Sequence, residues 1–199
     1  NSWGKPLTDG FEAKFTKLGG KVLLTEGVPE GSTDFRTIIA KLKALDGLDA
    51  VVSPTYPKEG GNFVRQAKEL NLAKPMFGGD NWGSPEFLNI AANAADGVFY
   101  TAPSENTSPE YEAFAKKYQA KFGEEPDVFG AYSYDAAMAV FKAIKASEST
   151  EPEKIREALL NVSFDGASGD ISFRANGDVA SKAFGRKEIK DGKAVNITK

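Results

Sequence analysis

Apolar residues in the first hundred positions recur with two different periods. Short apolar runs typical of buried strands occur at 21–25, 49–53, 75–77 and 97–101. In the segments beside these runs, apolar residues return every three or four positions, which predicts amphipathic helices over 6–18, 35–45, 63–70 and 85–92. This alternation predicts βαβ units, whose right-handed crossovers place helices on both faces of a parallel sheet. The predicted fold class is therefore α/β, with a Rossmann-like doubly wound parallel sheet up to about Pro103.

The second half of the chain has a different pattern. Helices without parallel strands between them are predicted over 109–122, 127–146 and 152–159. Strands follow at 169–173, 184–189 and 195–197, and the pairs Asn176-Gly177 and Asp191-Gly192 favour type I′ hairpin turns. The helices have broad apolar faces and no sheet to cover, and exposed apolar patches of that size are uncommon in monomers. The pattern therefore predicts that a partner segment is missing from this chain, with self-association as one way to cover the exposed helices.

The most informative candidate site follows the predicted strand at 75–77. Two glycines end this strand, and Asp80 and Trp82 come next, ahead of a helix that begins with Ser84 and Pro85. Ligands of open α/β sheets bind just outside the carboxyl ends of parallel strands. A carboxylate beside an indole at such an edge suits a ligand that has both a cationic and an apolar group.

Composition narrows the chemistry further. The chain contains no cysteine and no histidine, which excludes thiolate and histidine metal sites, Ser-His-Asp triads and Cys-His nucleophiles. No dinucleotide fingerprint or phosphate loop occurs, so we expect no cofactor and no metal. A net charge of −3 with interspersed lysines argues against nucleic acid as a partner. No apolar run is long enough to span a membrane, and residues 1–6 lack the apolar core of a signal peptide, so we expect any export signal to be absent from this chain.

Several short motifs occur in a characteristic order along nearly the whole chain. In the first section they are Trp3-Gly4-Lys5-Pro6-Leu7, Thr33-Asp34-Phe35, Tyr56-Pro57, Arg65-Gln66-Ala67-Lys68-Glu69-Leu70 and Gly78-Gly79-Asp80. In the second they are Ala94-Ala95-Asp96-Gly97-Val98, Tyr118-Gln119-Ala120-Lys121-Phe122-Gly123, Tyr134-Asp135-Ala136-Ala137 and Phe164-Asp165-Gly166-Ala167-Ser168-Gly169. As an ordered set they resemble the type I periplasmic binding proteins, in particular the leucine/isoleucine/valine-binding proteins of ABC importers.

The resemblance implies a clamp of two Rossmann-like lobes that close on a ligand by hinge motion. Family members are considerably longer, and this chain resembles their C-terminal part. Residues 1–103 would form most of the second lobe, 104–183 would be C-terminal elements of the first lobe, and 184–199 would return to the second. The protein would be periplasmic, or extracellular and lipid-anchored, and a membrane permease of an ABC importer would be its partner.

The resemblance also assigns ligand-binding residues, each of which has a simpler alternative. Asp80 would accept the ligand's α-ammonium, or it is a loop aspartate ahead of a helix cap. Trp3 and Tyr56 would pack on the ligand, with Thr55 as the candidate one position away, or they are ordinary packing residues. Phe129 would form an aromatic wall, or it is a core aromatic. Trp82 is a further candidate, but packing at the helix start is the simpler reading of this residue.

These observations favour a solute-binding protein without catalytic activity, whose ligand is a branched-chain or other apolar amino acid or a related carboxylate. Because the segments that would hold the ligand's carboxylate are not in this chain, we expect the 199-residue form to bind ligand weakly or not at all. A ligand-sensing domain of a receptor or regulator with the same fold is the alternative. A flavodoxin-like enzyme fits less well, because only Asp80 has a clear position at a cleft.

Overall fold

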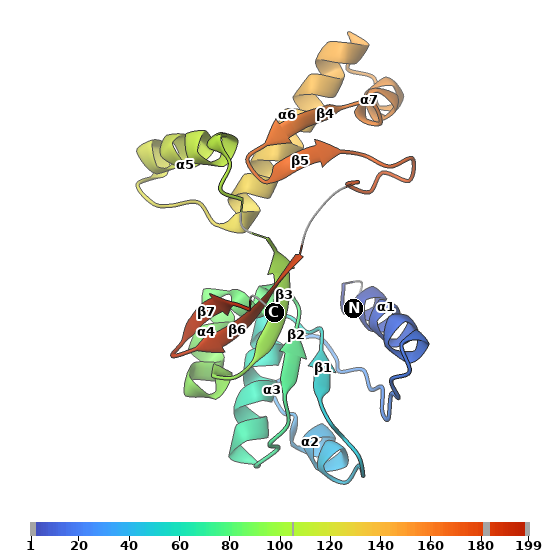
Figure 1. Ribbon diagram of the computed structural model, residues 1–199, viewed down its shortest axis with the longest axis vertical. Helices are drawn as coiled ribbons and strands as arrows, with labels where there is room; N and C mark the ends of the chain where they lie inside the picture. Colours follow the sequence, from blue (N-terminus) through green and yellow to red (C-terminus); the bar gives the residue numbers. More distant parts are fainter. Residues whose placement is uncertain (1–2, 105, 181–183, 198–199) are drawn as a thin grey trace. The chain divides into compact units, whose positions relative to one another are not determined.

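The computed structural model describes residues 3–104, 106–180 and 184–197, which form two compact units (Figure 1). The first unit comprises the described residues up to Ala102 together with those from Gly185 onward, and the second runs from Pro103 to Phe184. The last two residues of the segment predicted at 184–199 lie outside the described residues.

The first unit is built on a five-stranded sheet with the order β1-β2-β3-β6-β7. Strands β1 (Val51–Ser53), β2 (Met76–Gly78) and β3 (Phe99–Pro103) are parallel, with Ser53 opposite Gly78 and Gly78 opposite Tyr100. Strands β6 (Phe184–Lys190) and β7 (Lys193–Asn196) form an antiparallel hairpin. The amides of Gly97 and Ile189 bond to the carbonyls of Ile189 and Val98, which attaches this hairpin to the chain just before β3.

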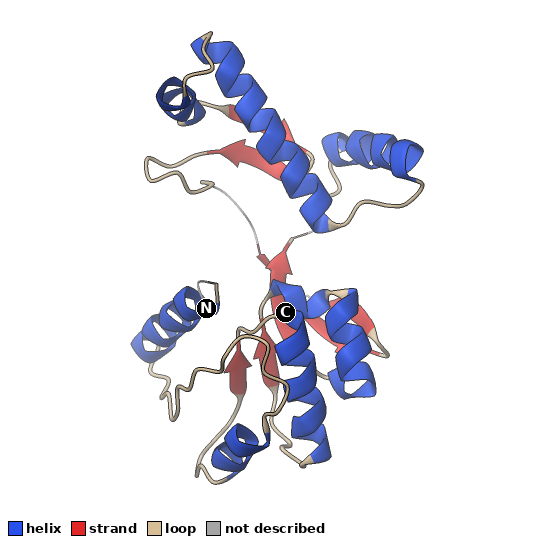
Figure 2. Ribbon diagram, turned by 180° about the vertical axis from the view of Figure 1, so that it is seen from behind, coloured by secondary structure: helices blue, strands red, loops and turns tan. Residues whose placement is uncertain are grey.

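Helices α3 and α4 cover one face of this sheet (Figures 1 and 2). The helical elements of the first unit are α1 (Gly4–Lys17), α2 (Arg36–Lys43), α3 (Pro57–Glu69), α4 (Pro85–Ala91) and the 3₁₀ turns η1 (Asp80–Gly83) and η2 (Ala92–Ala95). The predicted apolar stripe of α2 is buried at Phe35, Ile39 and Leu42. Ser84 caps α4 by accepting the amide of Phe87, as the sequence predicts. A single core therefore joins α2, α3 and α4 to the strands beneath the candidate site.

The other face of the sheet is open. Val52 and Phe77 are 38% and 39% exposed, whereas their neighbours Val51 and Met76 are buried under the helices. The prediction of a strand at 21–25 is wrong, because this segment has no ladder partner among the described residues. Leu23 nevertheless packs against the core, so the apolar run reflects burial without strand pairing.

Helix α1 also differs from expectation. It begins at Gly4, so that Pro6 is its third residue rather than its first. The apolar residues that share one face of this helix, Leu7, Phe11, Phe15 and Leu18, are all exposed. The exposed faces of α1 and of the sheet leave apolar surface in the first unit that its described part does not cover.

The second unit contains α5 (Pro109–Phe122), α6 (Val128–Ser147), α7 (Pro152–Leu159) and a hairpin of β4 (Ser163–Gly166) and β5 (Gly169–Ser172). Asp135 on α6 is buried, and its carboxylate accepts the amides of Ala167 and Ser168 at 2.9 and 2.6 Å and the Ser168 hydroxyl at 2.6 Å. A β-carbon on Gly166 would lie 2.4 Å from Asp135 Oδ2, so only glycine fits there. Two of the sequence motifs thus meet through one buried carboxylate.

The turns of the β segments were predicted only in part. Asp191 and Gly192 both have positive φ, as the type I′ prediction for the β6–β7 hairpin requires. The same prediction for Asn176-Gly177 is wrong, because of this pair only Gly177 has positive φ. Strand β4 was not predicted, and the ladder of β5 is with β4. Across the Asn176-Gly177 turn the pairing is limited to an antiparallel bridge between Phe173 and Val179.

Candidate functional site

The carboxyl ends of β1 and β2 bring most of the predicted site residues together. Because the two strands are parallel, with Ser53 opposite Gly78, the segments that follow them leave the sheet at the same edge. Thr55 and Tyr56 follow β1, and Asp80 follows β2. The start of α1 reaches this edge as well and carries Trp3 (Figure 1).

Trp3 and Tyr56 form an aromatic pair at this edge. Their rings are stacked, with centroids 5.6 Å apart and an interplanar angle of 15°, and both side chains are half-buried. The Trp3 ring also lies over Gly79, because a β-carbon on that glycine would stand 2.6 Å from Trp3 Cη2. The absence of a side chain at Gly79 therefore allows the indole to lie over the residue that precedes Asp80.

Asp80 is the first residue of η1 and is half-buried. Its Oδ1 accepts the amide of Asn81 at 2.9 Å. In the described part of the chain, no lysine or arginine forms an ion pair with this carboxylate. A carboxylate in this position can accept charge-assisted hydrogen bonds from a cationic ligand group beside the two rings.

Thr55 occupies a different part of the edge. Its hydroxyl lies 3.4 Å from that of Ser53 and close to Gly60 in the first turns of α3. Of the two neighbouring candidates, Tyr56 is therefore the one that joins the aromatic pair with Trp3, while Thr55 faces α3.

Trp82 belongs to the core beneath this edge. The residue is 0% exposed, and its ring stacks on Phe87 with centroids 4.9 Å apart. β-carbons on Gly60 and Gly78 would lie 2.4 and 2.0 Å from its indole, so the ring fills the space that these two glycines leave. Trp82 thus packs below the site, in line with the simpler of its two predicted roles.

Phe129 lies in the second unit, as the second residue of α6, and is 51% exposed. The prediction of a buried core aromatic at this position is therefore wrong. Asp127 caps the helix by accepting the amide of Gly130 at 2.7 Å. Asp127 is thus the N-terminal cap of α6. The described residues contain no group of acidic side chains that could hold a metal ion.

Sequence reasoning missed two polar residues of this region. Asn81 Oδ1, Glu59 Oε2 and Trp82 Nε1 are buried and have no hydrogen-bond partner within the described ranges. Glu59, in the first turn of α3, binds the loop between α1 and α2 by accepting the amide of Gly31 through its other oxygen. Its sequence position is that of an ordinary helix-start acid, and only its burial distinguishes it. Buried polar atoms without partners are rare in native proteins, and here they lie on segments that leave the carboxyl ends of β1 and β2.

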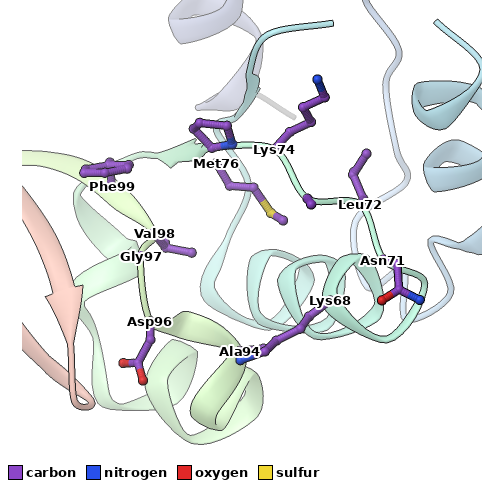
Figure 3. Close-up of a pocket in the computed structure, with 12 residues that line it drawn as sticks. Lys68, Asn71, Leu72, Lys74, Met76, Ala94, Asp96, Gly97, Val98 and Phe99 are labelled. Carbon is purple, nitrogen blue, oxygen red and sulfur yellow. The ribbon is translucent and has the colours of Figure 1, made fainter.

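A separate surface hollow of about 480 Å³ lies at the opposite edge of the sheet (Figure 3). It is lined by core residues such as Leu72, Met76 and Val98, which precede or begin β2 and β3. Two of its polar side chains bond to backbone groups, since Lys68 Nζ donates to the Asn93 carbonyl and Asp96 Oδ1 accepts the Gly192 amide. The hollow therefore lies away from the edge that carries Asp80.

Within the described residues, no helix combines the length and the apolar character that crossing a bilayer requires.

Comparison with known proteins places this arrangement in a family. The family described as periplasmic binding protein matches residues 1–193. The chain is 33% identical over 178 residues to a Leu/Ile/Val-binding protein homolog of Brucella suis, covering 88% of this chain and 47% of the relative. It thus spans about half the length of the curated relatives it matches.

Solved structures agree with this match. A leucine binding protein from Thermotoga maritima has a TM-score of 0.87 and 30% identity, covering 96% of this chain and 55% of that one. A branched-chain amino acid transporter substrate binding protein from Streptococcus pneumoniae, in complex with isoleucine, has a TM-score of 0.80 and 28% identity, covering 99% and 57%. These relatives are binding proteins and not enzymes, which confirms the prediction that the chain is not an enzyme. The α/β fold class is confirmed, and the chain belongs to the periplasmic binding protein family.

Proposed function

We propose that the protein is the substrate-binding component of an ABC importer and that it binds a branched-chain or other apolar amino acid. The observation that carries this proposal is the half-buried carboxylate of Asp80 beside the stacked pair of Trp3 and Tyr56, at the carboxyl ends of parallel strands. The Streptococcus pneumoniae relative, whose structure contains isoleucine, supports this ligand class.

Each residue of this edge has a chemical role in the proposal. Asp80 would accept hydrogen bonds from the ligand's α-ammonium, which needs a charged partner once it leaves water. Trp3 and Tyr56 would cover an apolar side chain, since burial of each methylene contributes about 0.8 kcal/mol. Trp82 would support the edge from below by filling the space under Gly78.

Capture would follow from closure of two lobes around the ligand. The first unit would supply the cation-binding half of the site, and Phe129 stays a candidate for an apolar wall. Ligand contacts made only in the closed state would stabilise that state. The protein would act in the periplasm, or outside the cell on a lipid anchor, and deliver its ligand to a membrane permease.

A ligand screen on the complete gene product that contains this chain tests the proposal. The melting temperature is measured with each of the common amino acids and with small carboxylates, and each stabilising ligand is then titrated by calorimetry. A ligand at 100 times its Kd adds about 2.7 kcal/mol to the stability of the folded protein, which is readily detected. We expect leucine, isoleucine or valine to give the largest shift. Absence of binding by every apolar amino acid would contradict the proposal.

A further inference from the structure

The buried amide oxygen of Asn81 is the unexplained polar group nearest to the proposed site. Asn81 follows Asp80 in η1, and its Oδ1 has no hydrogen-bond partner among the residues described. The same oxygen lies 3.8 Å from the point where a β-carbon on Gly79 would stand, with the Trp3 ring next to that point. Of the three unpartnered buried atoms, Asn81 Oδ1 is thus the one that faces Gly79 together with Trp3.

An ammonium group needs further hydrogen-bond acceptors besides the Asp80 carboxylate. It carries three N–H donors, and each must keep a partner when the group is taken out of water. One oxygen of Asp80 already accepts the amide of Asn81. A neutral amide oxygen on the next residue, buried and without a partner, is suited to accept an N–H that Asp80 leaves over.

We propose that Asn81 Oδ1 is a second acceptor for the ligand's cationic end and that it makes the site selective for primary ammonium groups. The inference rests on the proposed function. An unpaired buried acceptor costs free energy in the empty site, and this cost is removed when a donor arrives. A primary amine supplies that donor, whereas an N-methylated amine has one N–H fewer and leaves the oxygen unpaired or covered by a methyl group.

Ligand pairs and two substitutions test this role in the complete gene product. The Kd values of L-leucine and N-methyl-L-leucine are measured by calorimetry for wild type, Asn81→Leu and Asn81→Asp. The Asn81→Leu side chain has nearly the size of asparagine but lacks an acceptor, whereas the Asn81→Asp side chain keeps an acceptor oxygen. Circular dichroism shows whether each variant retains its fold. Wild type should prefer L-leucine, and Asn81→Leu should weaken L-leucine about tenfold while changing N-methyl-L-leucine less than about threefold. Asn81→Asp should bind L-leucine at least as tightly as wild type.

The possible outcomes separate this inference from the proposed function. If Asn81→Leu weakens both ligands equally, or if neither substitution changes the preference for L-leucine, Asn81 is not a specificity residue and the inference fails. The proposed function would survive that result, because wild type still binds an apolar amino acid. If wild type binds neither L-leucine nor any other apolar amino acid, both the inference and the proposed function are overturned.

Discussion

Replacing Gly79 with alanine tests the geometry of the candidate site without touching its functional groups. The backbone at Gly79 has φ −84° and ψ 179°, which any residue adopts, so alanine introduces no backbone strain there. Its β-carbon would, however, stand 2.6 Å from Trp3 Cη2 and 2.9 Å from Trp3 Cζ2, well inside normal contact distance. Trp3 must therefore move away, and its stacking on Tyr56 is disturbed.

The expected effect is modest in stability and clear in spectroscopy. A stacked aromatic pair contributes about 0.5–1.5 kcal/mol beyond its buried area. A loss of about 1 kcal/mol lowers the melting temperature of a domain of about 100 residues by roughly 4–8 °C. The 199-residue chain has two tryptophans, and Trp82 is 0% exposed while Trp3 is half-buried. A change in acrylamide quenching of tryptophan fluorescence therefore reports mainly on Trp3.

Gly10→Ala provides the matched control, because Gly10 lies on the same helix as Trp3 and a β-carbon there meets nothing within 4 Å. We expect Gly79→Ala to increase the quenching of Trp3 fluorescence and to lower the melting temperature, and we expect Gly10→Ala to do neither. Unchanged quenching and melting temperature in Gly79→Ala would show that Trp3 does not lie over Gly79, and would refute the proposed position of the Trp3–Tyr56 pair at the site.

Three further predictions concern the rest of the molecule. Asp135→Asn should destabilise the second unit by about 2–4 kcal/mol, because a carboxamide cannot accept all three hydrogen bonds that Asp135 receives from Ala167 and Ser168. Hydrogen exchange measures this, and amides of the β4–β5 hairpin should exchange faster in the variant while those of the first unit exchange as in wild type. Burial and the nearby Asp135 raise the pKa of Tyr132, so stability should fall as the pH rises above about 10. The late-ionising part of the absorbance change at 295 nm should be smaller in Tyr132→Phe than in wild type, and an unchanged late part would disprove the assignment. The 199-residue chain should self-associate through its open sheet face, on which Val52 and Phe77 are exposed. Light scattering should give a smaller particle mass for the double variant Val52→Lys, Phe77→Lys than for wild type. Equal masses for the two proteins would contradict this prediction.

The sequence pattern predicted the position of the site better than its contacts. Counting strands placed Asp80 and Tyr56 after neighbouring parallel strands, and the structure has them at one edge of the sheet. The stacking of Trp3 on Tyr56 was not predicted, because it depends on where α1 lies rather than on any local pattern. Asn81 was missed for a similar reason, since its distinguishing property is burial without a partner and not its residue type.

The errors in the predicted elements have a common physical origin. An apolar run records burial and does not record hydrogen bonding, so 21–25 was read as a strand although only packing by Leu23 holds it against the core. Strand β4 was missed because Ser163–Gly166 carries one large apolar side chain, and its pairing with β5 depends on the Asp135 carboxylate that binds the intervening turn. The spacing of apolar residues in α1 indicates which residues share a face but not what covers that face, and in the described part of the chain these residues are exposed.

The central claim is that the Asp80 carboxylate holds the positively charged end of an amino acid. It is tested by calorimetry on the complete gene product, with L-leucine and its deaminated analogue 4-methylpentanoate as ligands. Asp80→Asn should weaken L-leucine by about a hundredfold, the loss expected when a desolvated charge loses its partner, and should change 4-methylpentanoate little. Asp9→Asn is the control, because Asp9 is an exposed acid on α1 that pairs with Lys5. Binding of L-leucine by Asp80→Asn with the affinity of wild type would contradict the claim.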